Sequence, residues 1–348
     1  MFCNDVQYRK DVASAAAVSL PWEQLQDKTL LLTGATGLIG AFLMDVLSYR
    51  NEHEGMNLHI LAVSRNRASK ENPWITSLQW DVNEPMLAYP CQPDFIMHAA
   101  SNTHPLQYAK DPIGSLMTNL LGTQHLLDWA RKAHTQRVVF LSSVEIYGQA
   151  RAATDIFTED YCGNLNCNDL RACYPEGKRA GEALCQAYRS VYGLDIVIPR
   201  LSRVYGPTMK LDDSKAMSQF LKNGARYEDI VLKSEGKQRF SYCYVKDAVT
   251  GILTTWLLGN DGEAYNIADD PEEALTLREI TEIIAETTGR KVVFQLPDQQ
   301  EARGFSKVSV GILDNAKLKQ LGWRPEDTLR TGIVKTLPVL RTRMGIEV

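Results

Sequence analysis

Short apolar segments alternate with longer helical ones over the first 200 residues of the chain, and this alternation is the strongest constraint on the fold. Strands that are apolar throughout are typical of a parallel sheet that is covered on both faces. Six such strands are expected, at residues 28–33, 58–63, 77–80, 94–99, 137–142 and 195–199. Helices are expected between them, at about 38–49, 113–134 and 174–192. Because strand–helix–strand connections are right-handed, the pattern predicts an α/β fold with a doubly wound parallel sheet.

A glycine-rich segment, TGATGLIG at 33–40, lies between the first expected strand and the first expected helix. Glycines at such a turn let the backbone approach a pyrophosphate closely, and the N-terminus of the following helix attracts it. The spacing is G-x-x-G-x-x-G, unlike the G-x-G-x-x-G pattern of many dehydrogenases. The segment predicts a dinucleotide site made by Gly34, Ala35, Thr36, Gly37, Leu38, Ile39 and Gly40.

A tyrosine and a lysine, Tyr174 and Lys178, share one face of the expected helix 174–192 because they lie four residues apart. A nearby cation favours phenolate over phenol and would lower the tyrosine pKa from its usual ~10. Such a group can remove the proton of a sugar hydroxyl while hydride leaves the same carbon. Ser142 and Ser143 end the fifth expected strand, at the sheet edge where open α/β sheets place their active sites.

The charge and cysteine composition excludes several classes of protein. The net charge is −4 and the chain has no basic stripe, which argues against a nucleic acid or an anionic membrane as partner. No apolar run reaches ~18 residues, so no membrane span is expected. The seven cysteines include no C-x-x-C pair, and the spacing of Cys162, Cys167 and Cys173 fits no zinc module. Reduced thiols, no metal and a cytoplasmic location are therefore expected.

The regular alternation ends beyond Arg200, where loops, short apolar runs and isolated helices follow. Short strands are expected at 242–247 and 264–268, and helices at 275–288 and 314–321. The predicted organisation is a dinucleotide-binding domain over 1–200, to which 241–270 return, and a smaller C-terminal α/β substrate-binding lobe over 201–240 and 271–348. At the N-terminus, the run 12–20 is expected to form a short helix that ends before Pro21.

Taken together, these motifs resemble the extended short-chain dehydrogenase/reductases, specifically their nucleotide-sugar epimerase/dehydratase branch. The resemblance extends from about residue 28 to about residue 325 and implies a Rossmann fold. The motifs that carry it are TGATGLIG (33–40), WDV (80–82), HAAS (98–101), NLLGT (119–123), LSSVEIYG (141–148), YPEGK (174–178), PRLSRVYGP (199–207), YVKDA (244–248), AYNIA (264–268) and LGWRP (321–325).

The resemblance also implies roles for individual residues. Ser143 would hydrogen-bond the reacting hydroxyl, Tyr174 would be the acid/base and Lys178 would hold the nicotinamide ribose. The implied cofactor contacts are Asp81 and Val82 at the adenine, with His98, Ala99, Ala100, Ser101, Asn119 and Ser142 along the dinucleotide. The implied substrate contacts are Thr103, Ser143, Glu145, Arg203, Lys215 and Arg239. The implied partners are a nucleotide sugar and a second copy of the chain, which would form a homodimer through the helices at 113–134 and 174–192.

The choice between NAD and NADP depends on the end of the second strand. NAD users of this branch usually carry an acidic residue there, whereas this chain has Ser64 followed by Arg65. Arg65 could pair with the 2′-phosphate of NADP, or it is a solvated loop residue. Relatives that recycle their cofactor within one turnover generally keep NAD bound, so NAD is expected, with NADP open.

The binding of the substrate diphosphate departs from the family pattern. Relatives usually place an arginine four residues before the tyrosine of the Y-V pair, where this chain has Phe240 and the arginine, Arg239, lies one residue earlier. A local bulge would restore the contact, or another cation such as Arg203 or Lys215 would supply it. Arg203 stands where many relatives carry asparagine, and a guanidinium there suits an anionic substrate.

Glu145 is the residue that bears most on the reaction. Relatives that eliminate water carry an Asp-Glu pair after the reacting hydroxyl, and the Val144-Glu145 pair of this chain disfavours a dehydratase. The stretch RACYPEGKR (171–179) resembles the R-x-C-Y-x-E-G-K-R stretch of UDP-glucuronate decarboxylases. The expected function is NAD-dependent epimerase or decarboxylase chemistry that begins with oxidation at C4 of a nucleotide sugar. A 4,6-dehydratase, an NAD(P)H-dependent 4-ketoreductase and a non-catalytic dinucleotide sensor remain alternatives.

Overall fold

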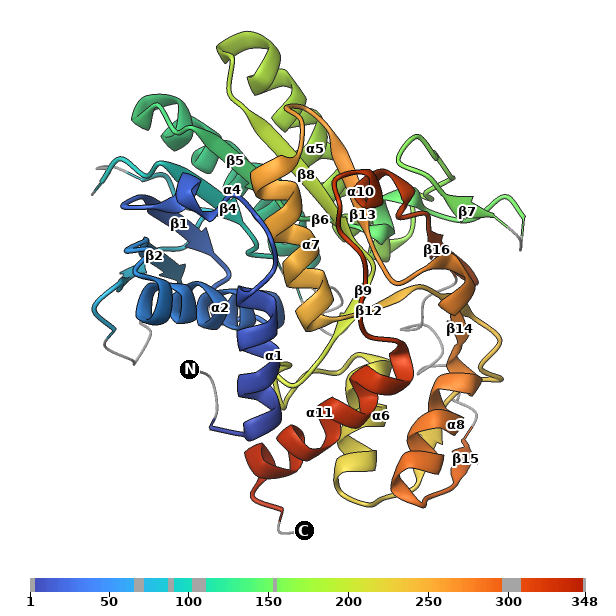
Figure 1. Ribbon diagram of the computed structural model, residues 1–348. Coiled ribbons are helices and arrows are strands. Elements are labelled where there is room, and N and C mark those ends of the chain that lie inside the picture. Colours follow the sequence, from blue (N-terminus) through green and yellow to red (C-terminus); the bar gives the residue numbers. More distant parts are fainter. Residues whose placement is uncertain are drawn as a thin grey trace.

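A large parallel sheet forms the centre of the computed structural model, which describes residues 4–65, 72–86, 91–101, 111–152, 155–295 and 308–346 (Figure 1). The strand order is β13–β8–β5–β4–β1–β2–β3, with β6 beside β8. These strands are β1 (Thr29–Thr33), β2 (His59–Ser64), β3 (Ile75–Gln79), β4 (Phe95–His98), β5 (Arg137–Phe140), β6 (Ser142–Ser143), β8 (Ile196–Leu201) and β13 (Ala264–Ile267). Every pairing among them is parallel, which confirms the predicted doubly wound sheet.

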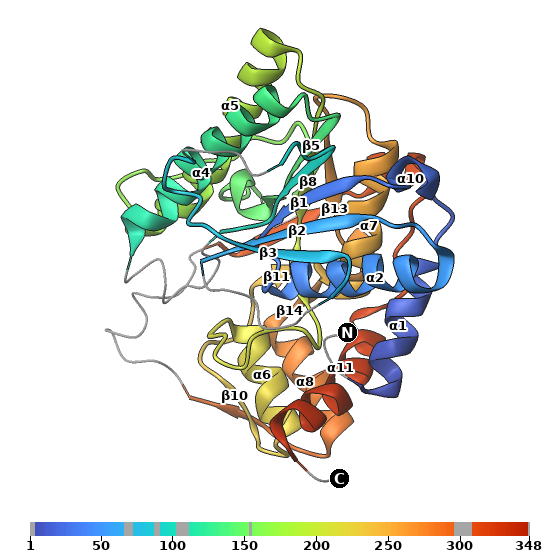
Figure 2. The ribbon, with the colours of Figure 1, turned by 90° about the vertical axis from the view of Figure 1, so that its left-hand side faces the viewer.

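Helices cover both faces of this sheet (Figure 2). On one face lie α1 (Val6–Ala16), α2 (Leu38–Glu54) and α7 (Val245–Leu258), and on the other lie α4 (Pro112–Ala133) and α5 (Cys173–Tyr192). Successive side chains of a strand point to opposite faces, so Leu30 and Leu32 join the core beneath α2 and α7, while Leu31 joins the core beneath α4 and α5. This double burial explains why the strands contain so few polar residues.

Most of the rest of the described chain forms a smaller group of elements beside the carboxyl ends of the central strands, whereas α10 (Ala316–Gln320) packs against α7 and β13 (Figure 1). Three small sheets hold it together: β10 with β15, β9 with β12, and β14–β11–β16–β7. The elements are β7 (Ile156–Phe157), β9 (Arg203–Tyr205), α6 (Ala216–Ala225), β10 (Ile230–Leu232), β11 (Arg239–Phe240), β12 (Tyr242–Tyr244), β14 (Leu275–Thr276), α8 (Leu277–Thr288), β15 (Val292–Phe294), β16 (Val310–Leu313) and α11 (Leu329–Met344). Short 3₁₀ turns occur in both parts of the molecule: η1 (Trp22–Leu25), η2 (Val144–Tyr147), η3 (Leu170–Ala172) and η4 (Pro271–Glu273).

Two sequence-based boundaries are wrong. The strand expected at 242–247 ends at Tyr244, where α7 begins. Nearly every residue of α7 is buried, so it lacks the one-sided polar pattern by which a surface helix is recognised. The N-terminal helix begins at Val6, before the expected run 12–20, and ends within that run. The side chain of Asp5 accepts the backbone N–H groups of Gln7 and Tyr8 and so caps the helix at this earlier position.

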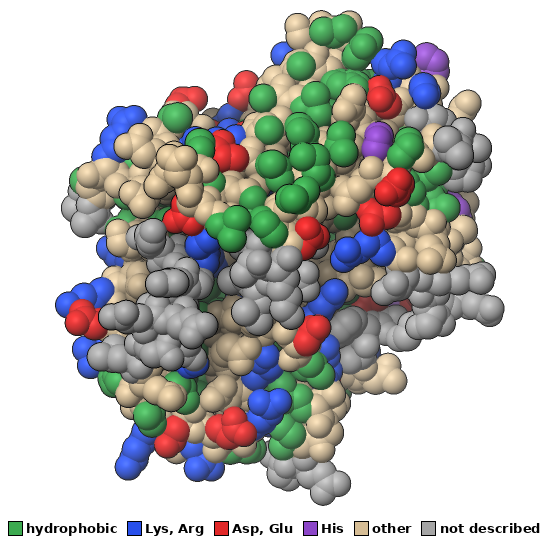
Figure 3. Space-filling model, turned by 180° about the vertical axis from the view of Figure 1, so that it is seen from behind, with side chains coloured by type: hydrophobic (Ala, Val, Ile, Leu, Met, Phe, Trp, Pro, Cys, Tyr) green, Lys and Arg blue, Asp and Glu red, His purple; other side chains and the backbone are tan. Residues whose placement is uncertain are grey.

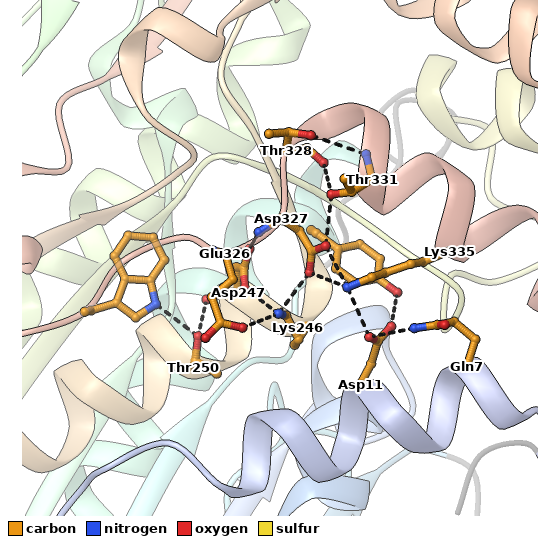
Figure 4. A network of polar contacts seen from close by, with 12 residues as sticks. Gln7, Asp11, Lys246, Asp247, Thr250, Glu326, Asp327, Thr328, Thr331 and Lys335 are labelled. Atoms are coloured by element: carbon orange, nitrogen blue, oxygen red, sulfur yellow. Dashed lines mark hydrogen bonds and ion pairs between the residues drawn. The ribbon is translucent and has the colours of Figure 1, made fainter.

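A buried ion network joins α1, α7, α11 and the segment before α11 (Figure 4). Lys246 of α7 is 4% exposed, and its Nζ lies 2.6 Å from Glu326, 2.9 Å from Asp327 and 3.5 Å from Asp247. Lys335 of α11 reaches Asp327 at 2.7 Å and Asp11 of α1 at 3.4 Å. We call these six side chains the ion network. It fastens both ends of the chain to the central sheet.

Candidate active site

One deep pocket opens where the carboxyl ends of the central strands meet the smaller group of elements. Its cavity volume is about 1040 Å³, at the upper end of the range for ligand sites. It runs from the glycine-rich segment after β1, past the end of β6, to α6 and β10. A cavity of this length accommodates a dinucleotide and a second ligand end to end.

The glycine-rich segment forms a cradle at the N-terminus of α2. Gly34 has φ +73°, and a Cβ at this position would lie 2.6 Å from the carbonyl oxygen of Ala99. A Cβ on Gly40 would lie 2.3 Å from the carbonyl oxygen of Gly34. Gly37 is the N-cap and has no side chain to bond the first N–H groups of α2, so these remain available to an anion. The cradle therefore fits the pyrophosphate of a dinucleotide.

Most of the sequence-predicted cofactor positions line this pocket. They are Gly34, Thr36, Gly37, Leu38, Ile39, Gly40, Arg65, Asp81, Val82, Ala99, Ala100, Ser101 and Ser142. Ala35, His98 and Asn119 are buried behind it. Asn119 accepts a hydrogen bond from the Ser101 hydroxyl at 3.1 Å, so it supports the pocket wall. The Oγ atoms of Ser142 and of Ser202 are buried in the wall and have no partner within the described chain, which suits a bound polar ligand.

His98 holds the backbone that follows β4. Its Nδ1 lies 2.8 Å from the Thr33 hydroxyl oxygen, and the same oxygen accepts the N–H of Ala100. Burial lowers the pKa of His98 to about 3, and the positive charge of Lys178 adds to this effect. The imidazole is therefore neutral at pH 7, and it orders the Ala99–Ala100 segment against which Gly34 packs.

Ser143 and Tyr174 meet in the middle of the pocket. Ser143 ends β6, Tyr174 lies in the first turn of α5, and their hydroxyl groups share a hydrogen bond. Burial raises the pKa of Tyr174 to about 12, which the Ser143 hydrogen bond counteracts and the charge of Glu145 reinforces. Ser143 also accepts the backbone N–H of Glu145 at 3.2 Å and so caps the 3₁₀ turn η2 that carries the glutamate.

Lys178 lies one turn beyond Tyr174 but is turned away from the pocket lining. Its Nζ donates to the carbonyl oxygen of Leu141 at 2.7 Å and sits 4.7 Å from the centre of the Phe140 ring. Burial lowers its pKa to about 8. The expectation that Lys178 lowers the Tyr174 pKa is wrong for this structure, because burial dominates the tyrosine and the ammonium faces Leu141.

The predicted substrate residues divide into three groups. Four of them line the pocket: Ser143, Glu145, Arg203 and Lys215. Arg239 does not, since its exposed side chain donates to the carbonyl oxygen of Ala274 at 2.9 Å. Thr103 lies outside the described residues. Arg203 stacks on Phe240, the residue at the position where relatives usually carry an arginine. Its Cζ lies 3.8 Å from the centre of the Phe240 ring.

Three further cations line the pocket without a role expected from the sequence: Arg171, Lys210 and Lys233. Arg171 lies three residues before Tyr174, so that spacing alone could have placed it at the same end of α5. Lys210 gives no comparable signal, because it lies in the loop before α6 and only the tertiary fold brings it to the pocket.

Within the described ranges, no cluster of His, Cys, Asp or Glu side chains is arranged to hold a metal ion. No described helix is both long and apolar enough to cross a membrane.

The fold and the pocket define a dinucleotide-dependent enzyme built on an open α/β sheet. The model of the NAD dependent epimerase/dehydratase family matches residues 30–268. UDP-glucuronic acid decarboxylase 3 of Arabidopsis thaliana is 31% identical over 329 residues, which cover 91% of this chain and 90% of that protein. The chain therefore belongs to the NAD dependent epimerase/dehydratase family, and the expectation of an NAD-dependent enzyme of this family is confirmed.

Solved structures show the same fold. The dTDP-glucose 4,6-dehydratase of Streptomyces venezuelae, with NAD and TYD bound, superposes with a TM-score of 0.78 at 25% identity, over 91% of this chain and 98% of that one. The UDP-glucuronic acid 4-epimerase of Bacillus cereus, in complex with UDP-glucuronic acid and NAD, has a TM-score of 0.74 at 19% identity, over 90% of this chain and 99% of that one.

Proposed function

We propose that this enzyme uses NAD to decarboxylate UDP-glucuronate through transient oxidation at C4. The observation that carries the proposal is one continuous cavity that joins the glycine cradle to Ser143, Glu145 and Tyr174. The match along nearly all of its length to a UDP-glucuronate decarboxylase supports the choice of substrate. Val144, in the position where dehydratases carry an acid, supports a reaction other than loss of water.

The oxidation step of the proposed reaction has its protein groups in place. Ser143 orients the C4 hydroxyl, and Tyr174 receives its proton as the phenolate, a minor form at pH 7 because burial raises the pKa of the phenol to about 12. When bound, NAD supplies the hydride acceptor that turns this alcohol into a ketone. A ketone at C4 makes the C6 carboxylate that of a β-keto acid, so the C5–C6 bond breaks and its electron pair passes into the C4–C5 enolate. Protonation at C5 and reduction at C4 then give a UDP-pentose and carbon dioxide.

The anion-binding groups of the smaller lobe fit the diphosphate of the substrate. The N-terminus of α6, a ten-residue helix, borders the pocket together with Lys210 and Lys215. Lys215 is the N-cap of α6, and its side chain makes no bond to the first turn of the helix. The backbone N–H groups of that turn are therefore left for a ligand. We assign the diphosphate to this end of the cavity and the sugar to the Ser143–Tyr174 end.

The enzyme is proposed to work as a homodimer. Side chains of the apolar type gather over α4 and α5 on the rear face of the molecule (Figure 3). Ile113 of α4 is 72% exposed, and Leu170, Val191 and Tyr192 at or in α5 are more than half exposed. Such a contiguous apolar face on two packed helices favours burial against a second copy.

The six described cysteines are all free thiols, and we place the enzyme in the cytoplasm.

Mass spectrometry of the products tests the proposed function. UDP-glucuronate incubated with the enzyme and NAD is expected to lose the mass of carbon dioxide and give a UDP-pentose. A product of unchanged mass with a new retention time would indicate a 4-epimerase. Loss of water from UDP-glucose or dTDP-glucose would indicate a dehydratase, and turnover only of a 4-keto sugar with added NADPH would indicate a reductase. Each of these three results would contradict the proposal.

A further inference from the structure

Arg203 is an incompletely bonded guanidinium in the wall of the pocket. Its Nη2 lies 3.4 Å from Oε1 of Glu145, which is a long contact for such a pair, and this is its one ion pair in the described chain. Its Nε is buried and has no hydrogen-bond partner among the described residues. The side chain is 29% exposed, so the remaining donors face the cavity.

Two other partly buried arginines show how this fold satisfies a guanidinium when the role is structural. Arg137 forms a bidentate pair with Asp195 at 2.7 and 2.9 Å and donates to the carbonyl oxygen of Trp256. Arg200 binds both oxygens of Glu182, at 3.0 and 2.7 Å, and two further acceptors. Arg203 has neither arrangement, although it is equally able to form a bidentate pair.

The stack on Phe240 fixes the orientation of Arg203. The guanidinium carbon lies 3.8 Å from the ring centre, so one face of the group is covered. Phe240 is itself buried, which makes the ring a rigid support. A guanidinium that is stacked on one face directs its N–H groups outward in its own plane, where a planar carboxylate can meet two of them.

The position of Arg203 identifies which part of the substrate it can reach. Its partner Glu145 follows Ser143 by two residues and acts electrostatically on Tyr174, so both side chains lie beside the hydroxyl groups that bind the reacting C4. The carbon next to C4 carries the C6 substituent of a hexose. An anionic group at C6 would therefore come close to Arg203, while the diphosphate lies towards α6.

We propose that Arg203 selects a uronate sugar by taking the C6 carboxylate as a bidentate partner in place of its long contact with Glu145. This inference rests on the proposed function, which places the sugar at Ser143 and Tyr174. Phe240 acts as a positioning residue, because it holds the guanidinium plane and has no polar group of its own. An uncharged C6 hydroxymethyl group, as in UDP-glucose, offers no such pairing.

Binding affinities measured in a Tyr174→Phe background, where no turnover interferes, test the proposal. Calorimetric titration of the NAD-loaded protein with UDP-glucuronate and with UDP-glucose gives a ratio of the two affinities. Adding Arg203→Gln is expected to weaken UDP-glucuronate binding roughly 10- to 100-fold, while UDP-glucose binding changes less than about 3-fold. Retained UDP-glucose binding also shows that the variant is folded. Arg203→Lys keeps the charge but lacks the planar guanidinium. Its affinity for UDP-glucuronate is expected to lie between that of the protein with Arg203 and that of the Arg203→Gln variant.

Lys210→Gln in the same background is the matched control, because Lys210 is another cation of the pocket. It is expected to weaken both ligands by similar factors. Equal weakening of both ligands by Arg203→Gln, or an equal change of the ratio by Lys210→Gln, would overturn the proposal. The result is independent of turnover: if the native enzyme released no carbon dioxide from UDP-glucuronate, the proposed function would fail while the affinity ratio still decided the role of Arg203.

Discussion

Two groups of charged side chains in this molecule differ in how completely they are bonded. In the ion network, Lys246 and Lys335 each contact two or more carboxylates, and Asp247 accepts the backbone N–H groups of Glu326 and Asp327 (Figure 4). In the pocket, Arg203 has one long contact with Glu145. No residue of the ion network lines the pocket.

The difference extends to the polar atoms around each group. Ten buried side-chain polar atoms lack a partner in the described part of the chain, and six of them belong to residues that line the pocket: Asn83, Ser142, Ser202, Arg203, Ser214 and Gln238. An unpartnered buried polar group lowers stability unless a ligand satisfies it. Complete bonding in this fold holds its parts together, and incomplete bonding leaves groups for the substrate.

The largest expected effect comes from Tyr174→Phe, which removes one hydroxyl from the pocket. Turnover of UDP-glucuronate should fall by roughly 10³-fold or more, because the proton of the C4 hydroxyl loses its acceptor. The unfolding free energy should change by about 1 kcal/mol, the typical contribution of a hydrogen bond such as that to Ser143. Tyr192→Phe, an exposed tyrosine on the same helix, is the control and should leave turnover unchanged. A similar loss in both variants would refute the assignment of Tyr174.

Lys246→Met should have the opposite effects: a large loss of stability and little change in turnover. It leaves the carboxylates of Asp247 and Asp327 without their shared ammonium, which should lower the free energy of unfolding by about 3–5 kcal/mol in urea titrations. The kcat/KM of the folded fraction should stay within about 3-fold of the native value. Lys237→Met removes an exposed pair with Glu235, which solvent screens, and should leave the stability almost unchanged. Equal losses in the two variants would show that burial of the ion network contributes nothing.

His98 is buried behind the pocket, and its Nδ1 is bonded to the Thr33 hydroxyl. Its folded pKa of about 3 lies below the unfolded value of 6.5, so the unfolded chain binds an extra proton between these values. Stability should therefore fall as the pH drops below 6.5. Between pH 7 and pH 5 the native protein should lose about 2 kcal/mol more unfolding free energy than His98→Asn does. Parallel losses in the two proteins would mean that His98 does not stay neutral in the folded state.

A substitution in the apolar face over α4 and α5 should have the smallest effect on the stability of the isolated chain. Ile113→Glu places a charge on a residue that is 72% exposed, so the fold should be unaffected. If this face binds a second copy, light scattering should show a shift from dimer towards monomer at micromolar concentration. Lys132→Glu, a charge reversal near the other end of α4, is the comparison. An unchanged dimer in Ile113→Glu would locate the subunit contact elsewhere.

The sequence predicted the parts of the molecule that depend on local pattern. Apolar strands, the glycines after β1 and the four-residue spacing of Tyr174 and Lys178 all have signals within a few residues, and the structure brings these segments to one sheet edge. The ion network has no such signal, because Asp11 and Lys335 are far apart in the chain and meet only in the tertiary fold. The direction of Lys178 and the stack of Arg203 on Phe240 likewise depend on contacts across elements.

Oxidation and re-reduction at C4 can be tested directly with UDP-glucuronate that carries deuterium at C4. We expect the deuterium to leave C4 and return to it within one turnover, so the UDP-pentose product should retain the label at C4 and no labelled NADH should accumulate. Two results would contradict this mechanism. One is transfer of the label from the product into free NADH, and the other is turnover without an isotope effect, in which the C4–deuterium bond is never broken.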